Sequence, residues 1–415
     1  MKLVSKMAMA VALSVGGMAV VAVPPAMALQ RKEKKAEQKA PELSKAARAA
    51  LAPAQEALGK SDFETARAKL TEADAVAQTT DEKYFTAQLW YNLAQSTNDE
   101  ALKKTAIDKM LASGGATPEQ LPQLYGAQAQ YAYNAKDYAK AETALTELTK
   151  LTPTNADNLI MLAEIKNVNK KPAEALQVID QAVQAKKAAG QPVSEEWYKK
   201  GMSIAYGAKS PEVSKWGSAW VAAYPSSESW RAVLQIFQEN NQLDPQTSLD
   251  LYRLQRAAKA LAGERDFYEY ANTAYERGLP GEAVSVIDEG MATNMLNSGN
   301  KAAVEVKGLA AEKVSSDKAQ LAALDTSARK AANGKAAAGT GDAYLGYGEW
   351  AKAADLYKVA LEKGQVDADQ VNTRLGIALA RQGQKDAAKA AFSQVKAGNR
   401  AAIAQYWTIW LDQQA

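Results

Sequence analysis

Two stretches of this sequence repeat one pattern at a distance of 34 residues. Residues 141–148 read AETALTEL, and residues 175–182 read ALQVIDQA. A small residue opens each stretch, and a large apolar residue, Leu145 or Ile179, follows four positions later. Residues spaced by three and four share one face of a helix. Pro153 follows the first stretch, where a proline ends one helix before another begins. The spacing therefore predicts repeated pairs of helices.

The same pattern recurs near the C-terminus with a shift of 35 residues. Each copy follows a glycine, Gly348 or Gly383, and Leu375-Gly376 lies one predicted helix before the second copy. Small residues let two helices touch, and a large residue fills the space beside them. The repeated residues are Ala353, Tyr357 and Ala360 in the first copy and Ala388, Phe392 and Val395 in the second.

These residues resemble the tetratricopeptide repeat family. The resemblance is close over residues 122–187 and 334–402, and weaker copies surround Ala66 and Ala283. It implies an all-α fold, an α-solenoid of stacked antiparallel helix pairs, with roughly twenty helices in about ten pairs. In this family the first helices of successive pairs line a concave groove, so the resemblance also implies a peptide or partner-helix ligand.

Composition excludes several classes of chemistry. The 415 residues include no Cys and no His, which removes disulfides, thiolate–zinc sites and every mechanism with an imidazole base. The formal charge is +3, and the basic run at residues 31–35 is short, whereas nucleic-acid binding needs a concentrated basic surface. The sequence therefore predicts no catalytic, cofactor-binding or metal-binding residues and no nucleic-acid partner.

Residues 1–28 have the pattern of a secretory signal peptide. Lys2 and Lys6 form a positive end, an apolar run follows, and small residues precede a cleavage site after Ala28. We expect an exported, periplasmic protein with no stable membrane insertion once the signal is removed. An uncleaved anchor is the alternative, although the apolar run of about 17 residues is at the short limit for spanning a bilayer.

The remaining chain is divided by composition and periodicity. We expect a basic polar tether at 29–45, a helical repeat array at 46–310, a degenerate or linker helical segment at 311–340, and further helix pairs with a capping helix at 341–415. The segment 311–340 is rich in Ala, Lys, Ser and Gly, and we expect a helical break there with a loop near Ala332–Lys335. The last segment is dense in aromatic residues, which favours a role in covering the last repeat.

The predicted function is a non-enzymatic scaffold of the cell envelope that binds peptide segments or partner helices. Two alternatives are an envelope glycan-processing enzyme, because Glu228-Ser229 is similar to a Glu-Ser pair of lytic transglycosylases, and a membrane-anchored assembly factor. Helical spacing places the groove-facing residues on two successive first helices, with a second, more basic groove near the C-terminus. The predicted groove residues are Gln123, Gln130, Tyr133, Asn134, Asp157, Glu164 and Asn167, and then Gln370, Arg374 and Arg381.

Overall fold

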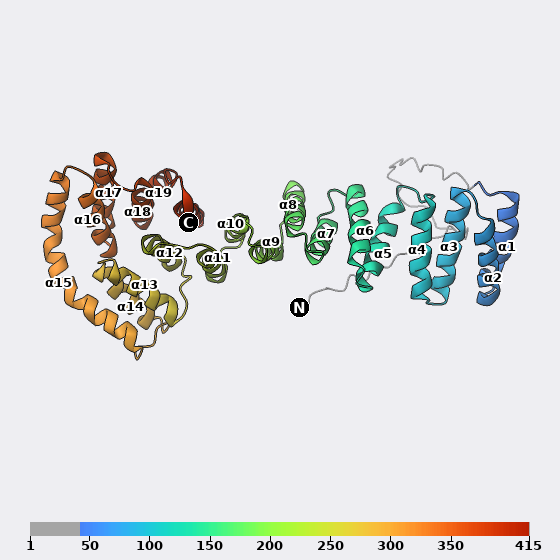
Figure 1. The fold of residues 1–415 in the computed structure, drawn as a ribbon, viewed down its shortest axis with the longest axis horizontal. Helices are drawn as coiled ribbons and strands as arrows, with labels where there is room; N and C mark the ends of the chain where they lie inside the picture. The colour runs from blue at the N-terminus through green and yellow to red at the C-terminus, as the bar shows by residue number, and fades with distance from the viewer. Residues whose placement is uncertain (1–41, 415) are drawn as a thin grey trace, which may run out of the picture. The chain divides into compact units, whose positions relative to one another are not determined.

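The computed structural model describes residues 42–414, which form twenty α-helices and no strand (Figure 1). The predicted all-α fold of paired helices is confirmed. The signal peptide at 1–28 and most of the predicted tether lie outside the described residues. None of the described helices has the length and hydropathy that a membrane crossing requires. The chain divides into two compact units, unit 1 up to Gln191 and unit 2 from Pro192.

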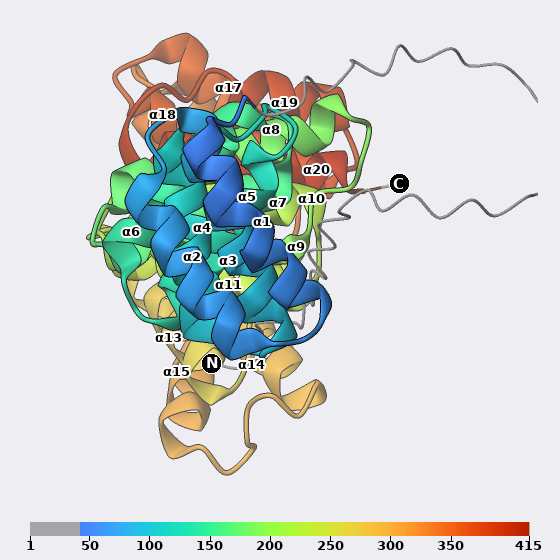
Figure 2. The ribbon, with the colours of Figure 1, turned by 90° about the vertical axis from the view of Figure 1, so that its right-hand side faces the viewer.

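Unit 1 is a run of helix pairs in which each helix packs against its neighbours in sequence. Figure 2 looks onto the first pair, α1 and α2, from the end of the run. The described helices of unit 1 are α1 (Lys45–Gly59), α2 (Phe63–Val76), α3 (Thr80–Ser96), α4 (Glu100–Ser113), α5 (Leu121–Asn134), α6 (Tyr138–Leu151), α7 (Ala156–Val168) and α8 (Pro172–Ala188).

In every pair of unit 1, the turn between the two helices contains one residue in the left-handed conformation. These residues are Ser61, Asn98, Lys136 and Lys170, with φ of 58°, 53°, 59° and 61°. A left-handed residue after the end of a helix turns the chain sharply, so the second helix can start within three residues. The next residue caps that helix in three of the four pairs, as when Asp137 Oδ1 accepts a hydrogen bond from the backbone N–H of Lys140.

The small residues of the repeat lie where helices meet. Ala141 on α6 and Ala175 on α8 are both 0% exposed, as the 34-residue spacing predicts. The opposite helix supplies Leu159, Leu162 and Ala163 of α7, which are also buried. The repeat register inferred from the sequence is therefore confirmed in this part of the chain.

Unit 2 starts as another run of pairs and then returns on itself. Both α18 and α20 pack against α12, and α20 also packs against α10 (Figure 1). The described helices of unit 2 are α9 (Glu195–Gly207), α10 (Val213–Ala223), α11 (Ser227–Asn240), α12 (Pro245–Ala257), α13 (Glu264–Glu276), α14 (Pro280–Ala292), α15 (Lys301–Lys330), α16 (Lys335–Gly346), α17 (Trp350–Lys363), α18 (Ala368–Arg381), α19 (Lys385–Phe392) and α20 (Gly398–Asp412).

The longest helix of unit 2 changes the predicted segment boundaries. The boundary predicted between residues 310 and 311 falls inside α15, a continuous helix of 30 residues. Its alanine-rich sequence favours a helix throughout. The chain therefore continues as a helix here although the repeat pattern is weak. The non-helical residues lie at 331–334, between α15 and α16, close to the loop expected from Asn333-Gly334.

The last helix, α20, is buried from two sides. Tyr406 and Trp407 are almost fully enclosed. Trp407 stacks on Phe392 of α19, while Tyr406 meets Trp230 and Phe237 of α11 edge to face. The aromatic residues near the C-terminus therefore cover the last repeat and also join it to an earlier part of unit 2.

Candidate functional site

Asp250 on α12 is the centre of a buried ion network in unit 2. Its side chain is 0% exposed. Its Oδ1 accepts hydrogen bonds from Arg253 Nη1 at 2.9 Å and from Arg374 Nε at 3.1 Å, and its Oδ2 accepts one from Arg400 Nη1. Arg374 and Arg400 belong to α18 and α20, 124 and 150 residues later. The network therefore ties α12 to both helices that return to it.

Two further carboxylates complete the network. Glu282 on α14 accepts hydrogen bonds from Arg253 at 2.8 and 2.7 Å, and the Tyr270 hydroxyl donates a third at 2.6 Å. Asp342 on α16 accepts one from Arg374 Nη1 at 2.5 Å. Three guanidinium groups thus meet three carboxylates, so each buried charge has a partner of opposite sign, as buried charges require.

Burial and pairing shift the pKa values of these carboxyl groups in opposite directions. Burial alone raises the pKa of Glu282, but attraction to Arg253 and its hydrogen bonds outweigh burial and leave that pKa lowered. At Asp342 burial is the stronger effect, so its pKa is raised although Arg374 and the Tyr357 hydroxyl stabilise the charged form. The Arg253–Glu282 pair is therefore the firmly ionised part of the network.

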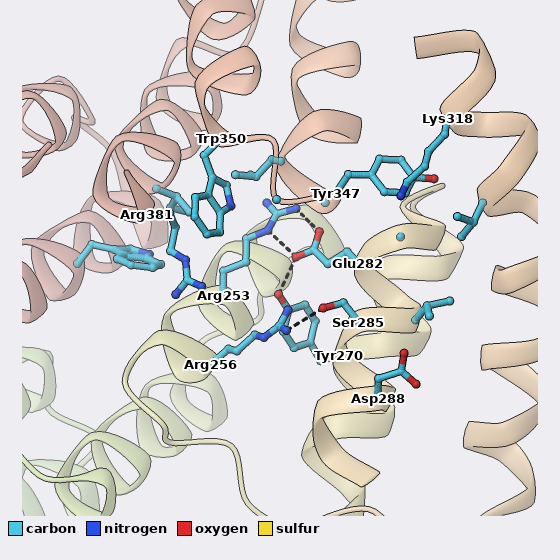
Figure 3. A pocket seen from close by; sticks show the side chains of 18 residues that line it. Arg253, Arg256, Tyr270, Glu282, Ser285, Asp288, Lys318, Tyr347, Trp350 and Arg381 are labelled. Carbon is cyan, nitrogen blue, oxygen red and sulfur yellow. Dashed lines mark hydrogen bonds and ion pairs between the residues drawn. The ribbon is translucent and has the colours of Figure 1, made fainter. Parts of the chain in front are cut away.

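A pocket of about 460 Å³ lies beside this network (Figure 3). Its lining comes from α12 to α18, including the turn between α16 and α17, and from α20. Four cationic and two acidic side chains line it, an excess of two positive charges. These charged residues are Arg253, Arg256, Lys318, Arg381, Glu282 and Asp288.

Most charges in the lining have a partner. Arg256 Nε donates to Glu289 at 2.6 Å, and its Nη2 donates to the Ser285 hydroxyl at 2.9 Å. Asp288 pairs with Lys307 at 2.5 Å. The Arg253 guanidinium is shared between the carboxylates of the buried network. Two cationic side chains of the lining, Lys318 and Arg381, are left over.

Lys318 and Arg381 each lie over an aromatic ring instead. Lys318 Nζ is 4.9 Å from the centroid of the Tyr347 ring, and Arg381 Cζ is 5.0 Å from that of Trp350. Burial and the nearby Arg256 charge lower the pKa of Arg381. Among residues 42–414 neither cation forms an ion pair with a carboxylate, although Glu289, the partner of Arg256, also attracts Arg381. The pocket therefore presents positive charge that the nearby carboxylates neutralise only in part.

In unit 1, Glu142 on α6 lies in a shallower pocket and ties α6 to the α7–α8 turn. It accepts hydrogen bonds from Lys166 at 3.0 Å, Lys171 at 2.8 Å and Asn169 at 2.7 Å. Burial raises the pKa of Glu142, but these donors outweigh burial and lower it to about 2. With its acceptor oxygens used in this way, Glu142 has a structural role.

The predicted groove residues of unit 1 lie on α5 and α7, two first helices that both pack against α6. All but one are exposed, and Glu164 is partly exposed. The exposed residues are Gln123, Gln130, Tyr133 and Asn134 on α5, and Asp157 and Asn167 on α7. We name this set, with Glu164, the α5–α7 face.

Two exposed apolar residues of α7 escaped the sequence analysis, and we add them to the α5–α7 face. Met161 and Val168 are 40% and 47% exposed. Steps of four, three and four residues from Asp157 lead to Met161, Glu164 and Val168, so all four share one side of α7. The signal was present in this spacing, but apolar residues in a repeat are more often core, and the sequence analysis weighed only polar positions.

The second predicted groove is wrong for one of its residues. Arg374 is 1% exposed and serves the ion network of Asp250. A charged residue in the middle of α18 is buried here because two carboxylates from other helices reach it, and helical periodicity cannot show that. Gln370 is partly buried and accepts a hydrogen bond from Arg400 at 3.3 Å. Arg381 alone lines an open pocket.

Glu228-Ser229, the pair behind the glycan-processing alternative, caps a helix. The Ser229 hydroxyl is buried and pairs with Ser226 in a reciprocal cap at the start of α11. A hydrogen bond from its own backbone N–H and one from Ser226 lower the pKa of Glu228, whereas a general acid needs a raised one. The geometry of this pair thus favours a cap over an acid catalyst. Within residues 42–414 no cluster of His, Cys, Asp and Glu is arranged for a metal ion.

The contact between the two helices of a pair identifies the type of repeat. A Cβ atom at Gly376 of α18 would lie 2.4 Å from the ring of Phe392 on α19, and one at Gly341 of α16 would lie 2.9 Å from Tyr357 on α17. In each pair a first-helix glycine receives an aromatic ring located 16 residues later, as the sequence predicted for Leu375-Gly376. The fold is tetratricopeptide-like. In unit 1 the buried small residues of the first helices include Ala129 and Ala163.

Comparisons with known proteins agree with a helical repeat. No protein-family model and no curated protein matches the chain. Similar solved structures include PilF of Pseudomonas aeruginosa, at 15% identity over 63% of this chain and 97% of that one, with a TM-score of 0.23. The Naa15/Naa10 complex bound to HypK-THB matches at 15% identity over 85% of this chain and 64% of that one, with a TM-score of 0.32. The TPR domain of P58(IPK) matches at 16%, over 81% and 98%, with a TM-score of 0.21. The fold assignment rests on the helix pairs, because superpositions at these TM-scores do not establish it.

Proposed function

We propose that this tetratricopeptide-like chain is a non-enzymatic scaffold of the cell envelope that binds a segment of a partner protein on the α5–α7 face. The observation that carries the proposal is the mixture of exposed apolar and polar side chains on two successive first helices. Tyr133, Met161 and Val168 are 38%, 40% and 47% exposed. Apolar side chains of this size gain free energy when a partner covers them, by about 25 cal/mol for each Å² buried.

The chemistry of the α5–α7 face suits a protein more than a charged ligand. Amide groups such as Gln130 and Asn134 can donate and accept hydrogen bonds, and Gln130 Nε2 already donates to Asn134 Oδ1 at 3.0 Å. Aromatic residues and Met are enriched at protein interfaces, while charged residues are depleted from their centres. A partner segment lying across α5 and α7 would bury the apolar groups and satisfy the amides.

Site-specific photocrosslinking tests the α5–α7 face. A photoreactive amino acid at Met161 should crosslink to a discrete partner in intact cells, and the triple variant Tyr133→Ser, Met161→Ser, Val168→Ser should lose the partner in a pull-down. The matched control is Val304→Ser, Leu309→Ser, Leu324→Ser on α15, whose residues are 46%, 43% and 44% exposed. Exposed substitutions cost about 0.5 kcal/mol or less each, so both proteins should melt near the wild type. A triple variant that keeps every partner would reject the α5–α7 face.

Export is the second part of the proposal. It is supported by Lys2 and Lys6, the apolar run and the small residues before Ala28. The intact mass of the protein recovered from the envelope should correspond to a chain that starts at Leu29. Recovery of the full-length chain in the inner membrane would instead support the membrane-anchored assembly factor, with the same interaction surface presented from an anchor.

A further inference from the structure

The starting point is the pair of cations, Lys318 and Arg381, that border the pocket of unit 2. Ring contacts of this kind occur elsewhere in the described chain, but there the cation usually has a carboxylate as well. Lys109 lies over Trp90 and pairs with Asp74. Lys352, over Tyr344, pairs with Glu349. An aromatic ring holds a cation in place without neutralising its charge, so Lys318 and Arg381 remain available to an anion.

The position of Arg381 has a cost that an anion would remove. Arg381 lies near Arg256, and this like charge together with burial disfavours its protonated form. Like charges held close together oppose the folded state. Positions where a chain keeps such an unfavourable arrangement are often functional. Glu289 pairs with Arg256 and attracts Arg381, and the carboxylate of a ligand at Arg381 would add a direct attractive contact that this guanidinium lacks.

We infer that the pocket of unit 2 binds an acidic segment of a protein, with one carboxylate at Arg381 and another at Lys318. This site is distinct from the α5–α7 face of unit 1, and either site can exist without the other. Guanidinium groups match the two oxygens of a carboxylate. Lys318 supplies a single point of positive charge at the far end of the pocket.

The spread of charge favours an extended ligand with several carboxylates over one compact anion. Arg381 and Lys318 come from α18 and α15 and lie at opposite sides of the labelled group in Figure 3. The volume of about 460 Å³ lies in the range of pockets that hold small ligands or a few residues. The rings of Tyr347 and Trp350 form the walls between the two ends.

Binding of fluorescein-labelled hexaglutamate to the full chain without residues 1–28, followed by anisotropy, tests the inference directly. The wild type should bind, more weakly as salt rises. Arg381→Gln and Lys318→Gln should each weaken binding by about tenfold or more, because each removes a charge-assisted contact. The matched control is Arg265→Gln, which removes the same charge from α13, where Arg265 pairs with Glu269 of its own helix.

Thermal melting separates a binding role from a structural one. Arg381→Gln removes the repulsion from Arg256 together with the attraction to Glu289, so its melting temperature should stay near that of the wild type. A lower melting temperature together with weaker binding would mean that Arg381 supports the fold, and the inference would fail. Equal binding by the wild type and Arg381→Gln, or an equal loss in Arg265→Gln, would also overturn it.

Competition identifies the source of the carboxylates. Unlabelled hexaglutamate should displace the probe at far lower concentration than citrate or inorganic phosphate, which span only one end of the pocket. Displacement by citrate at the same concentration as the peptide would replace the acidic segment with a small polycarboxylate and overturn the assignment. The Tyr133/Met161/Val168 serine variant should bind hexaglutamate as the wild type does, so a failure of the α5–α7 face leaves this result unchanged.

Discussion

The two units join successive repeats by different kinds of interaction. In unit 1 the ion pairs between repeats reach about one repeat along the chain, as from Asp74 to Lys109 and from Asp108 to Lys140. In unit 2 the hydrogen bonds of Asp250 reach 124 and 150 residues along the chain, to Arg374 and Arg400. The pairs of unit 1 are partly exposed, whereas Asp250 is completely buried. Unit 1 is thus held by repeated local contacts, whereas unit 2 is also held by distant ones, among them the junction at Asp250.

This difference locates the sensitive points of the molecule. A partly exposed ion pair contributes about 0–1 kcal/mol, because water screens it and its side chains lose freedom. A buried pair that loses one partner leaves a bare charge, which costs about 3–5 kcal/mol. Loss of a single ion pair in unit 1 should therefore lower the free energy of unfolding only slightly, whereas in unit 2 the largest loss should follow from a substitution of Asp250.

The largest predicted effect follows from Asp250→Ala. It leaves Arg253, Arg374 and Arg400 short of a carboxylate, so unit 2 should lose about 3–5 kcal/mol. Hydrogen exchange followed by mass spectrometry should show faster exchange in α12, α18 and α20, with α1–α8 unchanged. The control is Asp108→Ala in unit 1, which should cost about 1 kcal/mol or less. Equal effects of the two substitutions would mean that the junction does not hold unit 2.

Glu142→Gln tests unit 1 through its pH dependence. The folded pKa of about 2 is below the unfolded value of 4.5, so the contribution of Glu142 is complete above pH 4.5 and is lost as the pH falls toward 2. At pH 7 the variant should be less stable, by no more than about 3 kcal/mol. Near pH 2 the two proteins should melt together. A difference that persists at pH 2, or an equal response in Glu147→Gln on the exposed side of α6, would contradict the assigned role.

A pair of glycine substitutions sharpens the contrast in helix packing. Gly376→Ala in unit 2 places a methyl group 2.4–2.7 Å from the ring of Phe392, and overpacking of this kind costs about 1–3 kcal/mol. Gly126→Ala in unit 1 places one 3.9 Å from Leu148, an ordinary contact, so the better helix propensity of alanine should stabilise α5 by about 0.5–1 kcal/mol. Urea unfolding measures both changes in stability. Adding Phe392→Leu to Gly376→Ala should recover part of the stability that Gly376→Ala loses.

The smallest predicted effect concerns the turns. Unit 1 has residues other than glycine at the turns within its pairs, whereas unit 2 has Gly278, Gly348 and Gly383 at three equivalent turns and Lys209 at the α9–α10 turn. A side chain in the left-handed region costs about 1–2 kcal/mol, partly offset by the greater freedom of glycine in the unfolded chain. Lys136→Gly should therefore raise the melting temperature slightly, and Gly348→Ala should lower it. Changes in the opposite directions would show that the side chains make compensating contacts.

Sequence periodicity was sufficient for the local fold. The positions of Ala141 and Ala175, the approach of Phe392 to Gly376 and the exposure of the polar α5 residues all follow from spacing along one or two helices. The closure of unit 2 could not be predicted in this way, because it depends on which distant carboxylate meets Arg374. The pocket was missed for the same reason, since Lys318 and Arg381 lie on different helices and are 63 residues apart in the sequence.

The return of α18 and α20 to α12 also sets an order of events during folding. Contacts between neighbours in sequence form quickly, whereas contacts between distant residues require a long loop to close first. Each pair of unit 1 can therefore fold soon after it leaves the ribosome. Asp250 has no such option for two of its partners, since Arg374 and Arg400 lie 124 and 150 residues later in the chain. Unit 2 must keep its charged core open to water until about 150 further residues have arrived, a period when a helper protein could hold it unfolded.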